Sequence, residues 1–273
     1  MIQTLSTLAL LKSEKRANVL SVAINNPPLN MLDVPLMEDM LSLIDLSEGD
    51  DEIKVIIIRS SDPEFFVSHA DLTLFQNHDS PEAKKLLDMC ELFAHKIRQS
   101  SIIFIAEIAG RTSGAGCEFI EALDMSFAAI GKAFFRHPEV SLGLMPCKGG
   151  TQMLPQIIGK KRAMEMILTG SFIDAEIAER FGLINRAVMP SVLQSFVEKT
   201  AKTIAQHPKA SIASAKKAIN INHKKEAWKV ERELFNNVVK TEACQKRLAH
   251  FFANGGQTRE GELSNVAPPY LED

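Results

Sequence analysis

The stretch Gly110-Arg111-Thr112-Ser113-Gly114-Ala115-Gly116-Cys117-Glu118 follows directly on the apolar run Ile102–Ala109. A buried strand, a glycine-rich turn and a helix start are typical of an α/β core with buried strands. The helix start leaves backbone N–H groups unpaired at the positive end of the helix dipole. The stretch therefore predicts an anion-stabilising turn with a carboxylate, Glu118, within the first turns of the helix.

A second glutamate stands in a comparable setting. Glu139 lies in the segment Arg136-His137-Pro138-Glu139-Val140-Ser141-Leu142-Gly143. A carboxylate near such N–H groups places an acid/base group and an oxyanion-binding turn in one pocket. Taken singly, Pro138-Glu139 would more often be an exposed loop, but the two segments together indicate an enzyme that enolises a carbonyl compound.

The rest of the first half alternates strands and helices. Residues 7–12 and 18–25 predict a hairpin around a polar turn at 13–17. Asp33 and the Ser80-Pro81-Glu82 triplet predict helix starts, because they carry N-cap residues and early prolines. We expect the second of these helices to end near Arg98. Strands are expected at Val55–Ile58, Ile102–Ile108 and near Met125–Ile130, with a helix from about Ala115 between the last two.

After Thr151 the pattern is helical, with predicted helices at 151–158, 160–168, 174–181, 191–206, 209–222 and 225–253. The last carries an apolar stripe formed by Trp228, Leu234, Phe235, Val238 and Val239. Such a stripe beyond a complete core usually packs on another element, often a neighbouring subunit. We therefore divide the chain into a core (1–190), a helical oligomerisation region (191–256) and a flexible tail (257–273).

Composition excludes several classes of function. Of the 273 residues 45% are hydrophobic and 24% charged, and the net charge is −3, which gives no reason to expect nucleic acid or a membrane surface as partner. No apolar run approaches the ~20 residues of a membrane span. Cys90, Cys117, Cys147 and Cys244 lack metal-ligand spacing and predict reduced thiols in a cytoplasmic protein without a bound metal.

Five ordered motifs resemble the crotonase family, the enoyl-CoA hydratase/isomerase superfamily. They lie between Asn26 and Asn185, within a resemblance that runs from about Ala9 to the last helix. The motifs are Asn26–Leu32, Phe66–Leu72, Gly110–Glu118, Pro138–Leu154 and Phe172–Asn185. The resemblance implies an α/β fold built as a spiral of β-β-α repeats, with a C-terminal helical trimerisation region. It also implies a homotrimer or a dimer of trimers, an acyl-CoA substrate, and no metal or redox cofactor.

The resemblance also assigns roles to residues of the site. The amides of Ala70 and Ala115 would donate to the thioester oxyanion, and Glu118 and Glu139 would be the acid/base pair. Ala115 replaces the family's usual glycine, which narrows the pocket but keeps the N–H. Further substrate or CoA contacts are carried over to Pro28, Leu29, Ser68, His69, Asp71, Leu72 and Gly114.

Three residues depart from the family pattern or carry an alternative interpretation. His69 stands where hydratases have glycine, so it either contacts the thioester or CoA phosphates, or points away and bonds to backbone. Asp71 more often caps its turn than reacts. Glu107 occupies a small apolar position of the strand and is interpreted as a satisfied structural carboxylate.

The retained glutamate pair favours an enoyl-CoA hydratase that adds water to a trans-2-enoyl-CoA. The first alternative is an isomerase, hydrolase or decarboxylase acting on CoA thioesters with the same scaffold, which His69 and Ala115 make more plausible. A remote alternative is a catalytically idle scaffold or RNA-associated protein. A lost glutamate or a basic stripe would mark it, and the sequence shows neither.

Overall fold

The computed structural model describes residues 7–76, 80–220 and 226–264. One sheet has the order β1-β2-β3-β5-β7-β10. Its strands are β1 (Leu11–Arg16), β2 (Val19–Ile24), β3 (Val55–Ser60), β5 (Ile103–Ile108), β7 (Met125–Ala129) and β10 (Arg186–Val188). From β2 onward neighbouring strands run parallel, and only β1 is antiparallel to its neighbour. The buried parallel strands explain the near-continuous apolar sequence of β3 and β5.

A second, smaller sheet has the order β4-β6-β8-β9. Its strands are β4 (Phe65–Val67), β6 (Arg111–Ser113), β8 (Phe134–Arg136) and β9 (Ile173–Asp174). β4, β6 and β8 are parallel, and β9 pairs antiparallel with β8. From β3 to β8 the strands belong to the two sheets in alternation, which confirms the predicted α/β fold with recurring strand pairs.

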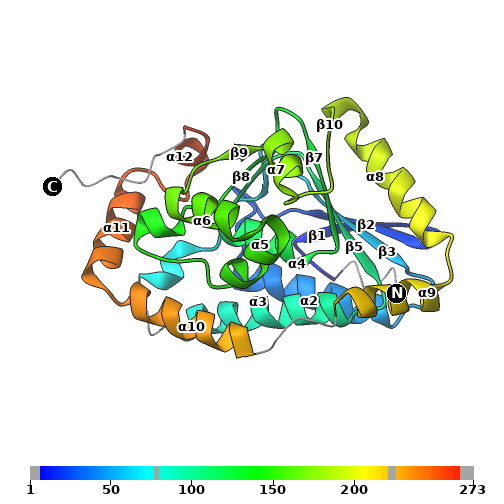
Figure 1. The fold of residues 1–273 in the computed structure, drawn as a ribbon, viewed down its shortest axis with the longest axis horizontal. Helices are drawn as coiled ribbons and strands as arrows, with labels where there is room; N and C mark the ends of the chain where they lie inside the picture. The colour runs from blue at the N-terminus through cyan, green and yellow to red at the C-terminus, as the bar shows by residue number, and fades with distance from the viewer. Residues whose placement is uncertain (1–6, 77–79, 221–225, 265–273) are drawn as a thin grey trace.

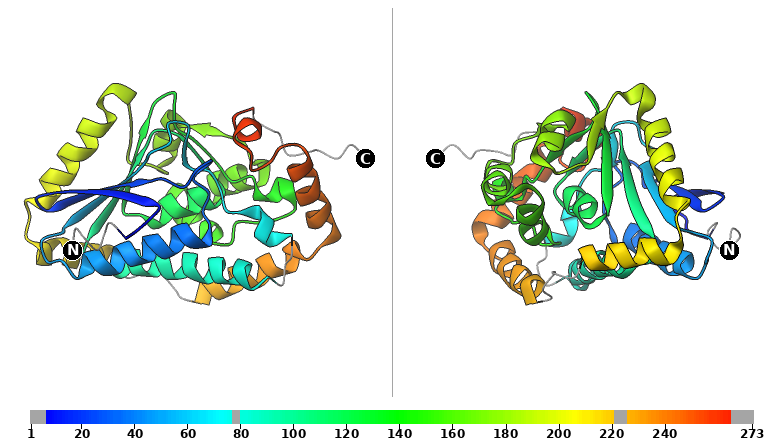
Figure 2. Two further views of the ribbon diagram at one scale, coloured as in Figure 1. Left: turned by 180° about the vertical axis from the view of Figure 1, so that it is seen from behind. Right: turned by 45° about the vertical axis from the view of Figure 1, so that its right-hand side comes forward.

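Helices cover both faces of the larger sheet (Figures 1 and 2). On one face lie α2 (Val34–Glu48), α3 (Pro81–Gln99) and α4 (Ala115–Ala122), with α2 and α3 side by side. The other face is covered by α8 (Pro190–Ala205), whose Leu193, Val197 and Ala201 pack on β3, β5 and β7. Asp33 and Ser80 cap α2 and α3 as predicted, by accepting from Leu36 N and Ala83 N.

The predicted short helices after Thr151 are present as α5 (Gly150–Ile158), α6 (Lys160–Thr169) and α7 (Ala175–Phe181). α9 (Lys209–Ile219) contacts α3, and its predicted continuation to residue 222 lies outside the described residues. Two short 3₁₀ helices, η1 (Leu72–Phe75) and η2 (Glu139–Leu142), follow the turns that carry His69 and Pro138.

Two boundaries predicted from the sequence are wrong. The hairpin turn is at Ala17 and Asn18, because Ala17 adopts a left-handed φ of 52°, so that Ser13–Arg16 belong to β1. The helix predicted over 225–253 is two helices, α10 (Glu226–Val239) and α11 (Glu242–Ala253). Thr241 caps α11 by accepting from Cys244 N, and this cap starts a new helix.

The C-terminal helices fold back onto the chain's own core. Of the predicted apolar stripe, Phe235 and Val239 are buried, while the side chains of Trp228, Leu234 and Val238 lie outside the described residues. The segment 257–264, predicted as part of a flexible tail, is folded and contains α12 (Arg259–Leu263). Arg259 of this helix pairs with Asp62 at 2.5 Å, which holds it against the core. Residues 265–273 lie outside the described residues.

Candidate active site

Two backbone amides at the edges of one cavity have no hydrogen-bond acceptor among the residues that the structure describes. Ala115 is the first residue of α4, after Gly114 with a left-handed φ of 52°. Ala70 lies three residues beyond β4, beside an isolated bridge to Leu32. Within the described part of the chain neither N–H donates a hydrogen bond, and both residues line the cavity. Unpaired N–H groups of this kind bind an oxyanion.

The close approach of α4 to β4 fixes the two segments that carry these amides relative to each other. A Cβ on Gly116 would lie 2.1 Å from the carbonyl oxygen of Val67, so the two backbones leave room only for glycine. Glycine is therefore required at Gly114 by its positive φ and at Gly116 by the contact with the backbone of Val67.

Glu118 is buried in the cavity wall, with 2% of the residue exposed. Its Oε1 accepts from Lys148 N at 2.6 Å and from Gly150 N at 2.9 Å, whereas its Oε2 has no partner among the described residues. Burial raises the pKa of Glu118 to about 6, and the neighbouring Glu139 carboxylate adds to this rise while Lys148 opposes it. One oxygen is thus fixed by the protein and the other is available to a ligand.

Glu139 begins η2 and faces the same cavity. Neither carboxylate oxygen has a hydrogen-bond partner in the described chain, and Oε1 lies 3.6 Å from Nδ1 of His137. His137 is completely buried, and its Nε2 lies 2.8 Å from Oε1 of Glu121. Burial alone would lower the pKa of His137, but the two carboxylates raise it well above its usual value. His137 therefore lies between the carboxylates of Glu121 and Glu139, which favour its protonated form.

Both ring nitrogens of His69 already have hydrogen-bond partners within the protein. Neither is therefore free to contact the thioester or the CoA phosphates. Nδ1 lies 2.8 Å from the carbonyl oxygen of Ala70, and Nε2 lies 2.9 Å from Oε1 of Glu262 in α12. The alternative in which His69 bonds to backbone describes this structure, although the ring still lines the cavity. Glu262 raises the pKa of His69 despite its burial.

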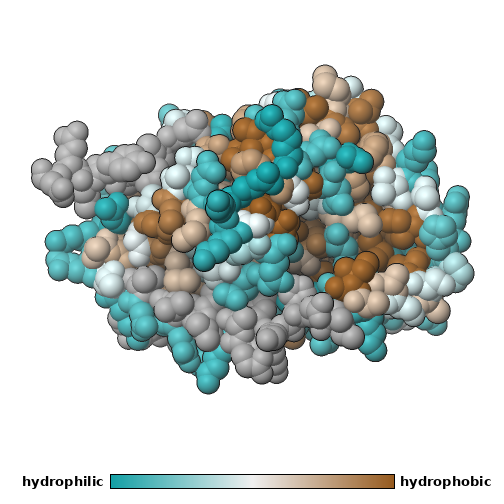
Figure 3. Space-filling view, in the orientation of Figure 1, coloured by the Kyte–Doolittle hydropathy of each residue, from teal (hydrophilic) through white to brown (hydrophobic). Residues whose placement is uncertain are grey.

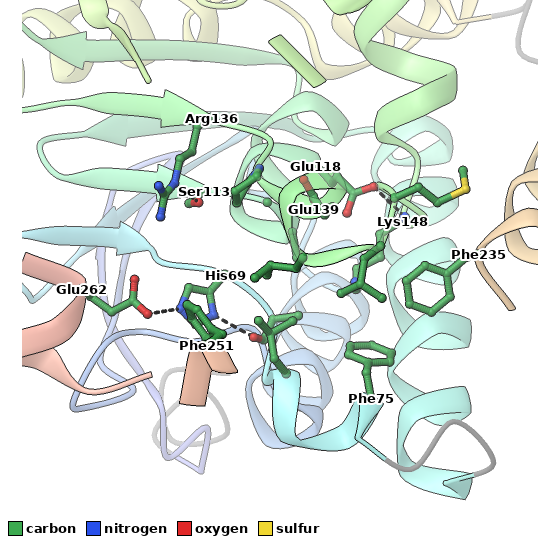
Figure 4. Close-up of a pocket in the computed structure, with 18 residues that line it drawn as sticks. His69, Phe75, Ser113, Glu118, Arg136, Glu139, Lys148, Phe235, Phe251 and Glu262 are labelled. Carbon is green, nitrogen blue, oxygen red and sulfur yellow. Dashed lines mark hydrogen bonds and ion pairs between the residues drawn. The ribbon is translucent and has the colours of Figure 1, made fainter. Parts of the chain in front are cut away.

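The remaining cavity wall is mostly apolar. In Figure 4 His69, Phe251 and Glu262 lie on one side, Phe75 and Phe235 on the other, and Glu118 and Glu139 above and between them. Phe75 and Phe235 meet edge to face with ring centroids 5.2 Å apart. Phe235 comes from α10, so the C-terminal helices complete the cavity.

Most of the predicted site residues meet in this cavity, and some do not. His69, Ala70, Leu72, Gly114, Ala115, Glu118 and Glu139 line it, whereas Pro28, Leu29, Ser68 and Asp71 do not. The predicted substrate contacts of these four stay predictions. Asp71 caps η1 by accepting from Thr73 N at 3.0 Å, as expected for a turn residue. Glu107 accepts from Arg59 Nη2 at 2.9 Å, which confirms it as a satisfied structural carboxylate.

Sequence reasoning missed Glu121, His137, Lys148, Phe235 and Glu262. Two of them carried a signal: Glu121 is a single carboxylate within the apolar run Phe119–Leu123, and Phe235 belongs to the predicted apolar stripe. In the part of the chain that the structure describes, no group of three His, Cys, Asp or Glu side chains is placed to hold a metal ion. No described helix is long and apolar enough to cross a membrane.

A family model described as enoyl-CoA hydratase/isomerase matches residues 14–257. A protein of Mycobacterium leprae named as a probable enoyl-CoA hydratase is 39% identical over 150 residues, which cover 54% of this chain and 58% of the relative. A short-chain-enoyl-CoA hydratase of Clostridioides difficile is 43% identical over 122 residues, which cover 45% of this chain and 77% of the relative. The chain thus spans little more than half the length of the first of these relatives.

Solved structures match over nearly the whole chain. The crystal structure of a Streptomyces avermitilis protein, assigned provisionally as an enoyl-CoA hydratase, superposes with a TM-score of 0.87 at 30% identity. The match covers 93% of this chain and 94% of that protein. Pseudomonas aeruginosa DspI superposes with a TM-score of 0.75, also at 30% identity, over 85% of this chain and 96% of DspI.

Proposed function

Because the chain belongs to the enoyl-CoA hydratase/isomerase family, we propose that it is an enzyme that adds water to a trans-2-enoyl-CoA thioester. One observation carries the proposal: two unpaired backbone amides and two buried carboxylates line a single apolar cavity. The relatives named as enoyl-CoA hydratases support the same reaction.

The reaction develops negative charge on the thioester oxygen, and the amides of Ala70 and Ala115 would donate to it. Two convergent N–H donors stabilise such charge, and the loss of one donor typically costs ~3 kcal/mol of barrier. Because these N–H groups have no other acceptor in the described chain, they need not break a bond there when the substrate binds.

The free oxygens of Glu118 and Glu139 would hold the attacking water. The water oxygen forms a bond to the β-carbon and transfers a proton to one carboxylate. The electron pair of the double bond moves toward the thioester as an enolate. A carboxylate then returns a proton to the α-carbon, which completes the addition of water. With a pKa of about 6, Glu118 is mostly ionised at neutral pH and can accept the first proton.

The side chain of Glu139 also has a neighbour outside the cavity. Nδ1 of His137 lies 3.6 Å from its Oε1. Glu121 in turn fixes the far side of the ring at 2.8 Å. We assign His137 and Glu121 as positioning residues, since neither side chain lines the cavity.

The proposal extends to the finer expectations drawn from the resemblance. The enzyme would act in the cytoplasm as a homotrimer or a dimer of trimers, with the CoA thioester as substrate and no metal or redox cofactor. An apolar groove lined by residues such as Ile157, Ile204, Ile212 and Ile219 offers a surface for subunit contact. Apolar residues gather on the right half of the face shown in Figure 3.

The experiment offers purified protein crotonyl-CoA and, separately, a trans-3-enoyl-CoA, and identifies the products by mass spectrometry. Formation of 3-hydroxybutyryl-CoA from the first supports hydration. Conversion of the second to a trans-2-enoyl-CoA, without any hydrated product from either, would assign the isomerase instead. Binding of RNA that weakens with salt, together with no turnover of either thioester, would favour the idle scaffold.

A further inference from the structure

Lys148 is a buried lysine whose ammonium group makes no hydrogen bond to a carboxylate among the described residues. Only 7% of the residue is exposed, and it lines the cavity beside Glu118. Its Nζ lies 5.3 Å from the ring centroid of Phe75 and 6.0 Å from that of Phe235. Its one hydrogen-bond partner in the described chain is the Sγ of Cys147 at 3.9 Å, a weak acceptor.

A second buried lysine in the same chain shows what a structural role requires. Lys216 is 4% exposed and also lies over an aromatic ring, that of Phe104 at 5.1 Å. Its Nζ, however, donates to Oδ2 of Asp124 at 2.7 Å and to the carbonyl oxygen of Ile102 at 2.6 Å. Buried ammonium groups are stable when they are paired in this way. Lys148 has the aromatic contact, but among the described residues the carboxylates of Glu118 and Glu139 act on it only from a distance, without a hydrogen bond.

The position of the ammonium within the cavity defines where an anion would sit. Phe75 and Phe235 lie on the side of the cavity opposite to His69 and Glu262 (Figure 4). The backbone N of Lys148 bonds to Glu118, which places the root of its side chain at the proposed reacting centre. The ammonium end lies over the Phe75–Phe235 pair. An acyl chain whose thioester binds at the amides of Ala70 and Ala115, and which extends toward these two rings, would bring its far end to this ammonium.

We propose that Lys148 binds a carboxylate at the far end of the acyl chain, so that the preferred substrates are enoyl-CoA thioesters of short dicarboxylic acids. The inference rests on the proposed acyl-CoA function. A neutral alkyl chain would leave the ammonium without a hydrogen-bonded anion in an apolar wall, whereas a carboxylate would pair with it and complete its hydrogen bonds. The two phenylalanine rings would pack on the methylene groups between the thioester and the carboxylate.

The competing role for Lys148 is to hold Glu118 ionised from a distance. The two roles differ in what they predict for neutral substrates. A lysine that acts on Glu118 affects every enoyl-CoA equally, whereas a lysine that binds a carboxylate changes the ratio between charged and neutral acyl chains.

The test measures dissociation constants by calorimetry for glutaryl-CoA, adipyl-CoA and hexanoyl-CoA, which bind without being hydrated. The wild type should bind one of the dicarboxylic thioesters about tenfold or more tighter than hexanoyl-CoA. Lys148→Met should abolish that preference, Lys148→Arg should keep part of it, and the exposed-lysine control Lys132→Met should leave it unchanged.

Equal affinity of the wild type for all three thioesters would overturn the inference. It would equally be overturned if Lys148→Met weakened hexanoyl-CoA and the dicarboxylic thioesters by the same factor. The test measures binding rather than turnover, so it separates the two proposals. If the protein hydrates no enoyl-CoA but still prefers a dicarboxylic thioester, the hydratase proposal is refuted and the role of Lys148 is supported. A failure to bind any of the three thioesters would refute both.

Discussion

The backbone contact between α4 and β4 leads to a quantitative prediction for Gly116→Ala. A Cβ at this position would lie 2.1 Å from the Val67 carbonyl oxygen, and real Cβ contacts are not closer than 3.0 Å, so the two backbones must separate by about 0.9 Å. Ala115 precedes Gly116, and Ala70 follows Val67 by three residues. The separation therefore moves the two proposed oxyanion donors apart by a comparable distance.

A misplacement of about 1 Å in a catalytic constellation costs roughly 10²-fold in rate. We expect kcat for crotonyl-CoA hydration to fall by about that factor. Overpacking should also lower the free energy of unfolding by about 1–3 kcal/mol. Steady-state kinetics and denaturant unfolding measure the two effects separately, and acyl-CoA binding shows whether the folded variant still has a cavity.

Gly49→Ala provides the matched control. Gly49 has a φ of −74°, and a Cβ there would meet its nearest atom, Leu46 O, at 3.5 Å. The activity of Gly49→Ala should equal that of the wild type, and its free energy of unfolding should lie within about 1 kcal/mol of the wild-type value. A Gly116→Ala variant with wild-type kcat and stability would refute the reasoning that this contact positions the two amides.

The remaining predictions concern three titrating groups. With the pKa of Glu118 near 6, kcat/KM should fall about tenfold per pH unit below pH 6, and a profile flat to pH 5 would contradict a role as base. Glu121→Gln removes the partner of a raised-pKa histidine, so it should cost about 3 kcal/mol of unfolding free energy at pH 6. That cost should shrink as the pH rises through the folded pKa of His137, well above 6.5, and a pH-independent loss would contradict the ion pair. Glu262→Gln should likewise destabilise the protein most below pH 6.5, and the difference from wild type should be lost at higher pH as His69 deprotonates. Thermal unfolding of the variant and the wild type measures this difference, and an unchanged Tm at pH 6 would contradict the His69–Glu262 contact.

The positions of the two candidate carboxylates and of the turns could be predicted because their signals are local. Glycine spacing, a preceding apolar strand and a following helix lie within one stretch around Gly114, and the structure places Glu118 and Glu139 in one cavity. The caps Asp33 and Ser80 could be predicted for the same reason, since a cap depends on residues three positions away.

Features that depend on distant segments could not be predicted in this way. Lys148 acquires its setting from Phe75 and Phe235, which are far from it in the sequence. The pairing of His69 with Glu262 joins residues separated by 193 positions and orders a segment that reads as a polar tail. The hairpin turn was misplaced because β1 consists largely of exposed charged residues, which hide the strand pattern.

The central claim is that Glu118 and Glu139 act together on one water molecule in this cavity. The most direct measurement compares wild type, Glu118→Gln and Glu139→Gln by the loss of the conjugated thioester absorbance of crotonyl-CoA. Each variant keeps the shape of the side chain and removes its charge, and acyl-CoA binding serves as the control for folding. We expect both variants to lose at least about 10²-fold in kcat with binding retained. Wild-type turnover in either variant would contradict the account.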